Sequence, residues 1–169
     1  RKIGDRYHLI GEEVIKGRNQ GKTFTQVQRE NPDLFTEEVF LQWGNVVDGL
    51  YDSWTLDENG DSNGNIVLTE FRIANTKVGI AGTVDIAVIQ PDGKIHLKDF
   101  KGTRFVYGEH SRKLDANAAQ LHIYRTILEA GDKELGLPPL EVASAEILPV
   151  ESNIVENAKG EFTSSVKDG

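Results

Sequence analysis

The segment from Gly82 to Lys101, "GTVDIAVIQPDGKIHLKDFK", constrains the fold of this chain more than any other part. It holds two runs of β-branched and apolar residues, separated by "PDGK", in which Asp92 and Gly93 favour a tight turn. Two such runs on either side of a turn predict antiparallel strands joined as a hairpin. The first strand, over 77–90, is apolar on both faces, which indicates a central position in a sheet.

Charged side chains collect at the end of this hairpin that lies away from the turn. Strand side chains repeat every two residues, so Asp99 and Lys101 share one face of the second strand. A turn at 92–93 places Asp85, on the first strand, opposite residue 99 or 101. We therefore expect Asp85, Asp99 and Lys101 to lie close together.

Such a cluster has two interpretations, a metal site or a salt bridge. Two facing carboxylates repel each other, and burying them without a partner is unfavourable, so a divalent cation between them is one solution. A lysine beside the cation can orient a water, which meets the requirements of metal-assisted phosphodiester hydrolysis. The plainer alternative is an Asp–Lys salt bridge at a sheet edge, because short motifs such as D-x-K match often by accident.

The rest of the chain predicts helices and one further strand around this hairpin. Thr36 is expected to cap the second helix, and the order helix, helix, three meandering strands, helix, strand predicts an α/β fold with a small mixed sheet flanked by helices. A length of 169 residues suits a single domain over 1–169. The expected helices cover 4–17, 35–54 and 114–130, and the other expected strands cover 65–73 and 140–150.

Composition limits the chemistry. The chain has no cysteine, so a metal would be held by carboxylates, carbonyls and the four histidines, which favours magnesium, manganese or calcium. No apolar run is long enough to cross a membrane, and we expect a cytoplasmic protein. The chain begins at Arg1 and contains no methionine, which indicates a piece excised from a longer protein.

The net charge of −8 argues against nucleic acid as a partner, because phosphate contacts dominate such binding. Two features weaken this argument. A bound cation neutralises part of the acidic charge, and basic residues are concentrated in "KDFKGTR" and "HSRK". That local cluster consists of Lys98, Lys101, Arg104, Arg112 and Lys113, with His110 in the same loop.

The element order and five short motifs resemble the PD-(D/E)xK nuclease superfamily, in its RecB-like and lambda-exonuclease-like branch. "GTVDIAV" is similar to the G-x-x-D strand of that family, "LKDFKG" to its D-x-K strand and "QLHIY" to its Q-x-x-x-Y helix. "YHLIGEE" places a histidine on the first helix, and Glu70 stands where many members carry a further acid. The resemblance covers roughly residues 4–149 and implies a restriction-endonuclease-like core.

The resemblance also implies a role for each matching residue. Asp85, Asp99, the backbone carbonyl of Phe100 and His8 would ligate Mg²⁺ or Mn²⁺, and Lys101 would position the attacking water. Glu70 would hold a water or a second metal, so the implied catalytic residues are Asp85, Asp99, Lys101 and Glu70. Gln120 and Tyr124 would brace Lys101 or the DNA backbone. The basic residues Arg104, Arg112 and Lys113 would contact DNA.

The implied function is that of a Mg²⁺- or Mn²⁺-dependent deoxyribonuclease that leaves a 5′-phosphate. An exonuclease is expected, because members of this branch are mostly exonucleases. Its partners would be DNA ends or single strands and the remainder of a larger helicase or replication protein. Its place would be recombination, repair or phage replication in a prokaryotic or phage-infected cell. The chain departs from the superfamily pattern in lacking the proline and in carrying Asp before the lysine, and both departures are usual in this branch.

Two alternatives from other classes remain at this point. One is a nuclease-like fold without activity that binds DNA or protein. The other is a calcium-binding module, because the stretch Asn59–Glu70 nearly fits the calcium-loop pattern. That reading requires a helix after Glu70, whereas the sequence "NIVLTEFRI" alternates like a strand.

Overall fold

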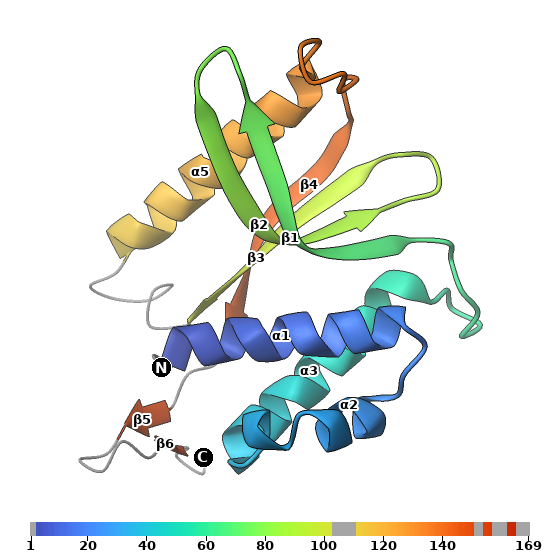
Figure 1. Cartoon of the computed structure of the whole chain (residues 1–169), viewed down its shortest axis with the longest axis vertical. Helices are drawn as coiled ribbons and strands as arrows, with labels where there is room; N and C mark the ends of the chain where they lie inside the picture. The colour runs from blue at the N-terminus through green and yellow to red at the C-terminus, as the bar shows by residue number, and fades with distance from the viewer. Residues whose placement is uncertain (1–2, 103–110, 151–153, 157–161, 165–169) are drawn as a thin grey trace.

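The computed structural model describes the backbone of residues 3–102, 111–150, 154–156 and 162–164, and the side chains of 6–101 and 118–150. Three helices precede the sheet, a long helix stands between its third and fourth strands, and a short hairpin follows (Figure 1). The helices are α1 (Ile3–Asn19), α2 (Phe24–Glu30), α3 (Glu38–Thr55) and α5 (Ser111–Ala130), with a 3₁₀ turn at Pro32–Leu34. The strands are β1 (Ile66–Asn75), β2 (Ile80–Ile89), β3 (Ile95–Gly102) and β4 (Val142–Val150), and the separate hairpin is β5 (Ile154–Glu156) and β6 (Phe162–Ser164).

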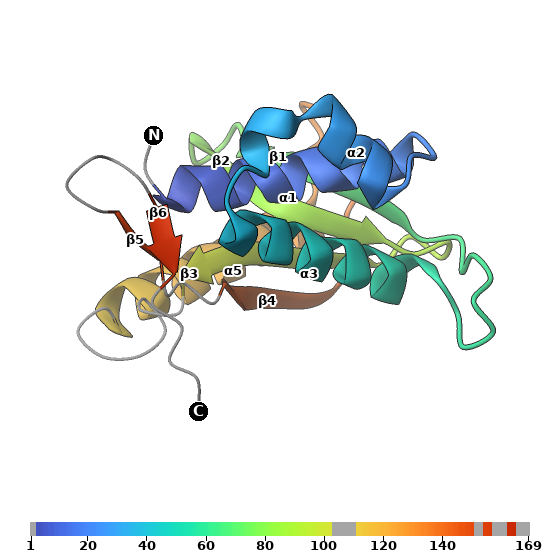
Figure 2. The ribbon, with the colours of Figure 1, turned by 90° about the horizontal axis from the view of Figure 1, so that it is seen from below.

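The four long strands form one sheet in the order β1-β2-β3-β4. The meander β1–β2–β3 is antiparallel, and β4 returns parallel to β3 after the crossover through α5. Helices α1 and α3 cover one face of the sheet, while α5 covers the other (Figures 1 and 2). The predicted α/β fold with a small mixed sheet flanked by helices is therefore confirmed.

The strands β1 and β2 change the face that they bury halfway along their length. Val67 and Ile86 pack into the core beneath α1 and α3, whereas Ile73 and Val84 pack into the core beneath α5. In a regular strand, Ile86 and Val84 would share one face, so the strand pair must rotate between them. The rotation coincides with Glu70, whose φ of 49° is the only positive φ at a described residue other than glycine.

Before the sheet, one local prediction needs correction and one helix was not predicted. Thr36 does not cap α3: the N-cap is Glu37, no side chain caps it, and the Thr36 hydroxyl instead donates to the Glu37 carboxylate. The helix α2 was not predicted, because seven residues are too few to show a periodic pattern. Its available signal was the capping box of Thr23 and Gln26, whose side chains and backbone amides bind each other reciprocally.

No helix in the described part of the chain combines the length and the apolar character that crossing a membrane requires.

Candidate active site

The strands β2 and β3 part at Asp85 and Asp99, and two carboxylates take the place of the backbone ladder there. The ladder ends at the pair Ile86 and Lys98. One position further, the Asp85 amide donates to Asp99 Oδ1 at 2.9 Å, and the Phe100 amide donates to Asp85 Oδ2 at 2.8 Å. The two aspartates therefore lie side by side, as the hairpin pattern predicts.

The helix α1 brings His8 to the same point. His8 Nε2 lies 3.1 Å from Asp85 Oδ2, and the His8 ring packs edge-on against Phe100. The helix can approach this closely because residue 11 is glycine: a Cβ there would lie 2.9 Å from the Phe100 ring. His8 is thus placed beside Asp85, where the resemblance implies a metal ligand.

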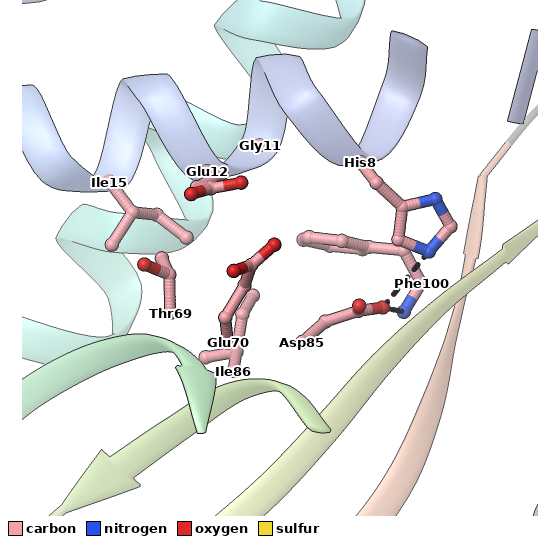
Figure 3. A pocket seen from close by; sticks show the side chains of 9 residues that line it. All are labelled: His8, Gly11, Glu12, Ile15, Thr69, Glu70, Asp85, Ile86 and Phe100. Atoms are coloured by element: carbon pink, nitrogen blue, oxygen red, sulfur yellow. Dashed lines mark hydrogen bonds and ion pairs between the residues drawn. The ribbon is translucent and has the colours of Figure 1, made fainter. Parts of the chain in front are cut away.

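Glu12 and Glu70 complete a small pocket beside Asp85. The pocket has a volume of about 30 Å³, and His8, Glu12, Glu70 and Asp85 line it together with Phe100. Figure 3 shows the Glu12 and Glu70 carboxylates, from α1 and β1, pointing into the same space. That space is large enough for one water or one ion.

Glu12 is a site residue that the sequence reasoning missed. It lies one helical turn after His8, and residues four apart face the same way on a helix. The four-residue spacing from His8 was the available signal. In the structure Glu12 also forms an ion pair with Lys16, which places a positive charge at the edge of the pocket.

Asp99 is a buried carboxyl group that stands beside a second carboxylate, Asp85. Burial raises the pKa of Asp99, and the negative charge of Asp85 raises it further. The hydrogen bond from the Asp85 amide and the positive charges of Lys101 and His8 lower that pKa, but they do not cancel the rise. A carboxyl held in this state is stabilised by a proton or by a cation.

The side chains around the pocket provide the types of ligand atom that Mg²⁺ and Mn²⁺ bind. Three carboxylates and one imidazole are available in His8, Glu12, Glu70 and Asp85, and hard divalent cations prefer oxygen ligands. Among the described side chains, no three acidic or histidine groups are already arranged to hold a metal ion. The chemistry of the donor set therefore fits the implied cation, while the present arrangement is looser than a preformed metal cage.

The G-x-x-D and Q-x-x-x-Y motifs meet through Gly82 and Tyr124. Gln120 Nε2 donates to the Tyr124 hydroxyl at 2.9 Å, and Tyr124 is buried. A Cβ at residue 82 would lie 1.7 Å from that hydroxyl oxygen, so only glycine fits there. The structure thus gives Tyr124 a packing role beneath β2. The predicted contact of Gln120 and Tyr124 with Lys101 or with DNA stays a prediction.

The predicted basic residues fall into three groups. Lys101 is partly exposed, and its charge acts on Asp99. Lys98 points elsewhere: it is buried, paired with Glu146 and placed over the Trp54 ring, so it does not belong to a basic surface. Arg104 and His110 lie outside the described residues, as do the side chains of Arg112 and Lys113 at the start of α5.

The Asn59–Glu70 stretch does not form a helix–loop–helix unit. Its polar groups stabilise their own turn: Asp57 Oδ1 accepts from the amides of Asn59 and Asp61, and Asn63 Nδ2 donates to the Trp54 carbonyl. The residues that follow form β1 rather than the helix which a calcium loop of this kind needs.

Comparison of the chain with protein families, with curated protein sequences and with solved structures finds no match. The functional argument therefore rests on the site geometry and on the motifs in the sequence.

Proposed function

We propose that this protein is a metal-dependent DNA nuclease of the PD-(D/E)xK type, which hydrolyses phosphodiester bonds and leaves a 5′-phosphate. The observation that carries the proposal is the pair Asp85 and Asp99 at the parting of two strands, with His8 3.1 Å from Asp85. Burial and like charge raise the pKa of Asp99, and perturbed carboxylates of this kind are typical of functional sites.

Each residue of the site has its own role in the proposed hydrolysis. A bound Mg²⁺ or Mn²⁺ would supply a Lewis acid and lower the pKa of a water. Asp85 and Asp99 would hold the cation, with His8 as a further donor and the Phe100 carbonyl at the edge of the site. Lys101 orients the attacking water and stabilises charge on the phosphate oxygens. Glu70, together with Glu12 across the pocket, holds a second water.

The restriction-endonuclease-like core is part of this proposal. The meander β1–β2–β3, the helix α5 and the parallel strand β4 follow one another in the order that the resemblance implies. The site occupies the middle of that meander, where a helix from the N-terminal segment crosses it. Within this class we favour an exonuclease acting on DNA ends or single strands in recombination, repair or phage replication, within the cytoplasm of a prokaryotic or phage-infected cell.

Incubation of the protein with linear and with circular DNA tests the proposal. We expect cleavage with Mg²⁺ or Mn²⁺ and none with EDTA, and an exonuclease spares the circular substrate. Lys101→Ala should abolish cleavage, whereas Lys94→Ala, at the turn end of the same hairpin, should leave it intact. Lys94 is a matched control because it is partly exposed and its nearest acid is Asp92 at 3.9 Å.

Survival of linear DNA in Mn²⁺ at high protein concentration would contradict the nuclease proposal. If the protein then still bound DNA, the inactive DNA-binding module would replace it. Equal cleavage by wild type and Lys101→Ala would locate the activity outside this site.

A further inference from the structure

In the described part of the chain, one face of the β1–β2 hairpin is exposed along the half nearest its turn. Its buried face packs Ile73 and Val84 against α5. The opposite face is exposed, and its residues are cross-strand partners, Arg72 with Thr83 and Ala74 with Ala81. We call these four residues the hairpin face: Arg72, Ala74, Ala81 and Thr83.

The hairpin face continues directly into the pocket. Glu70 and Asp85 line the pocket, and they lie two residues along β1 and β2 from Arg72 and Thr83. Two residues of a strand span about 6.7 Å, which is comparable with the spacing of successive phosphates along one DNA strand. A phosphate bound beside a cation in the pocket would therefore have its neighbour over Arg72.

The chemistry of the hairpin face suits a phosphate backbone. Thr83, Ala74 and Ala81 are small, so a chain of sugars and phosphates can approach the strands closely. Among the described residues, no carboxylate lies within ion-pair distance of the Arg72 guanidinium, whereas Arg18 and Arg125 are both paired. An exposed arginine that is not paired in this way is a ready phosphate ligand.

We propose that the hairpin face is the track on which one strand of the substrate DNA lies, with Arg72 binding the phosphate next to the one that is cleaved. The inference rests on the proposed nuclease function and extends it to the substrate-binding surface. Apart from Arg72, which is assigned to a phosphate, the face has only small side chains and no group that would reach base edges. Binding there is therefore independent of sequence, since phosphate contacts carry no base information.

Binding of a fluorescent single-stranded oligonucleotide, measured by anisotropy in Ca²⁺ with the substrate checked for integrity, separates this inference from cleavage. Arg72→Ala should weaken binding several-fold and reduce the magnitude of the slope of log K against log salt by about 0.7, the value for one phosphate contact on a single strand. Arg125→Ala removes the same charge from the exposed side of α5 and should change neither quantity. The melting temperature of both variants should stay at the wild-type value.

A second pair of variants tests the proposed track without replacing an arginine. Ala81→Glu places an acid on the hairpin face and should weaken binding, whereas Thr25→Glu adds the same charge at the exposed start of α2 and should not. Wild-type affinity in both Arg72→Ala and Ala81→Glu would overturn the track, as would wild-type protein that binds no DNA. Binding that depends on Arg72 in a protein without Mn²⁺-dependent cleavage would retain the track and reject the nuclease.

Discussion

Asp99 and Asp132 are both buried carboxylates, only 9% and 6% exposed, yet their pKa values shift in opposite directions. Asp132 follows α5 and accepts hydrogen bonds at both oxygens. Oδ2 receives the amide and hydroxyl of Thr76 at 3.1 and 3.0 Å, and Oδ1 receives the amides of Glu134 and Leu135. These hydrogen bonds, led by the one from the Thr76 amide, lower the pKa of Asp132.

Asp99 has a different environment. Among the described groups it accepts one hydrogen bond, from the Asp85 amide, and the Asp85 carboxylate stands beside it. Burial and that neighbouring charge raise the pKa of Asp99. Asp132 thus fastens the β1–β2 turn to the segment after α5, whereas Asp99 is a buried charge that the fold alone does not stabilise. The comparison separates a structural carboxylate from one that we assign to function.

The largest expected difference between the two aspartates is in catalysis. Asp99→Asn should lower the rate of Mn²⁺-dependent DNA cleavage by about 10²- to 10³-fold or more, the scale seen when one preorganised charge-stabilising group is removed. Asp132→Asn should leave the rate at the wild-type value. Initial rates of cleavage of linear DNA measure the effect of both variants. Equal losses of rate in the two would contradict the assignment of Asp99 to function and of Asp132 to structure.

The next largest effect concerns stability at the structural aspartate. Asp132→Ala leaves the Thr76, Glu134 and Leu135 amides without their acceptor, and unsatisfied donors destabilise a fold. We expect the melting temperature to fall by several degrees, as thermal unfolding followed by circular dichroism would show. Asp61→Ala, at an exposed position in the loop before β1, is the control and should have little effect. An unchanged melting temperature in Asp132→Ala would mean that the hydrogen bonds to the Asp132 carboxylate do not stabilise the fold.

A smaller effect of opposite sign is expected at Asp99. Asn keeps an oxygen to accept from the Asp85 amide but removes the charge repulsion between the two side chains. In the absence of divalent cations, Asp99→Asn should raise the free energy of unfolding by about 0.5 to 1 kcal/mol, the scale of a like-charge cross-strand pair. Urea unfolding in EDTA measures this, and a destabilised variant would argue that Asp99 is structural after all.

The pH dependence of these two effects should be the smallest and most diagnostic signal. The raised pKa of Asp99 means that its unfavourable contribution is absent below the unfolded value of about 3.9 and develops as pH rises through the folded pKa. The lowered pKa of Asp132 means that its contribution is present above that unfolded value and is lost as pH falls through the folded pKa. Toward acid pH, the stabilisation by Asp99→Asn and the destabilisation by Asp132→Ala should therefore both shrink. Urea unfolding at several pH values between about 3 and 7 tests this, and effects independent of pH would contradict it.

The sequence predicted the strands of the meander and the adjacency of Asp85 and Asp99, because hairpin geometry follows from a two-residue period and a turn. The hydrogen bond from the Phe100 amide to Asp85 was not predicted. It forms because β2 and β3 part here, and a regular ladder extrapolated from the turn does not anticipate such a parting. The carbonyl as a metal ligand stays a prediction.

Other parts of the site depend on tertiary structure that local patterns do not encode. The contribution of Glu12 depends on how α1 crosses the sheet, which Gly11 sets by admitting the Phe100 ring. The positive φ of Glu70 and the change of buried face at that residue have no local sequence signal. Asp132 was not singled out, because its partner Thr76 lies 56 residues away.

Mn²⁺ binding, measured by isothermal titration calorimetry near neutral pH, tests the central claim most directly: that the adjacent carboxylates Asp85 and Asp99 at the parting of β2 and β3 form the cation site. We predict that wild type and Asp132→Asn bind Mn²⁺ alike and that Asp85→Asn and Asp99→Asn lose this binding. Unchanged Mn²⁺ affinity in Asp85→Asn and Asp99→Asn would contradict the account.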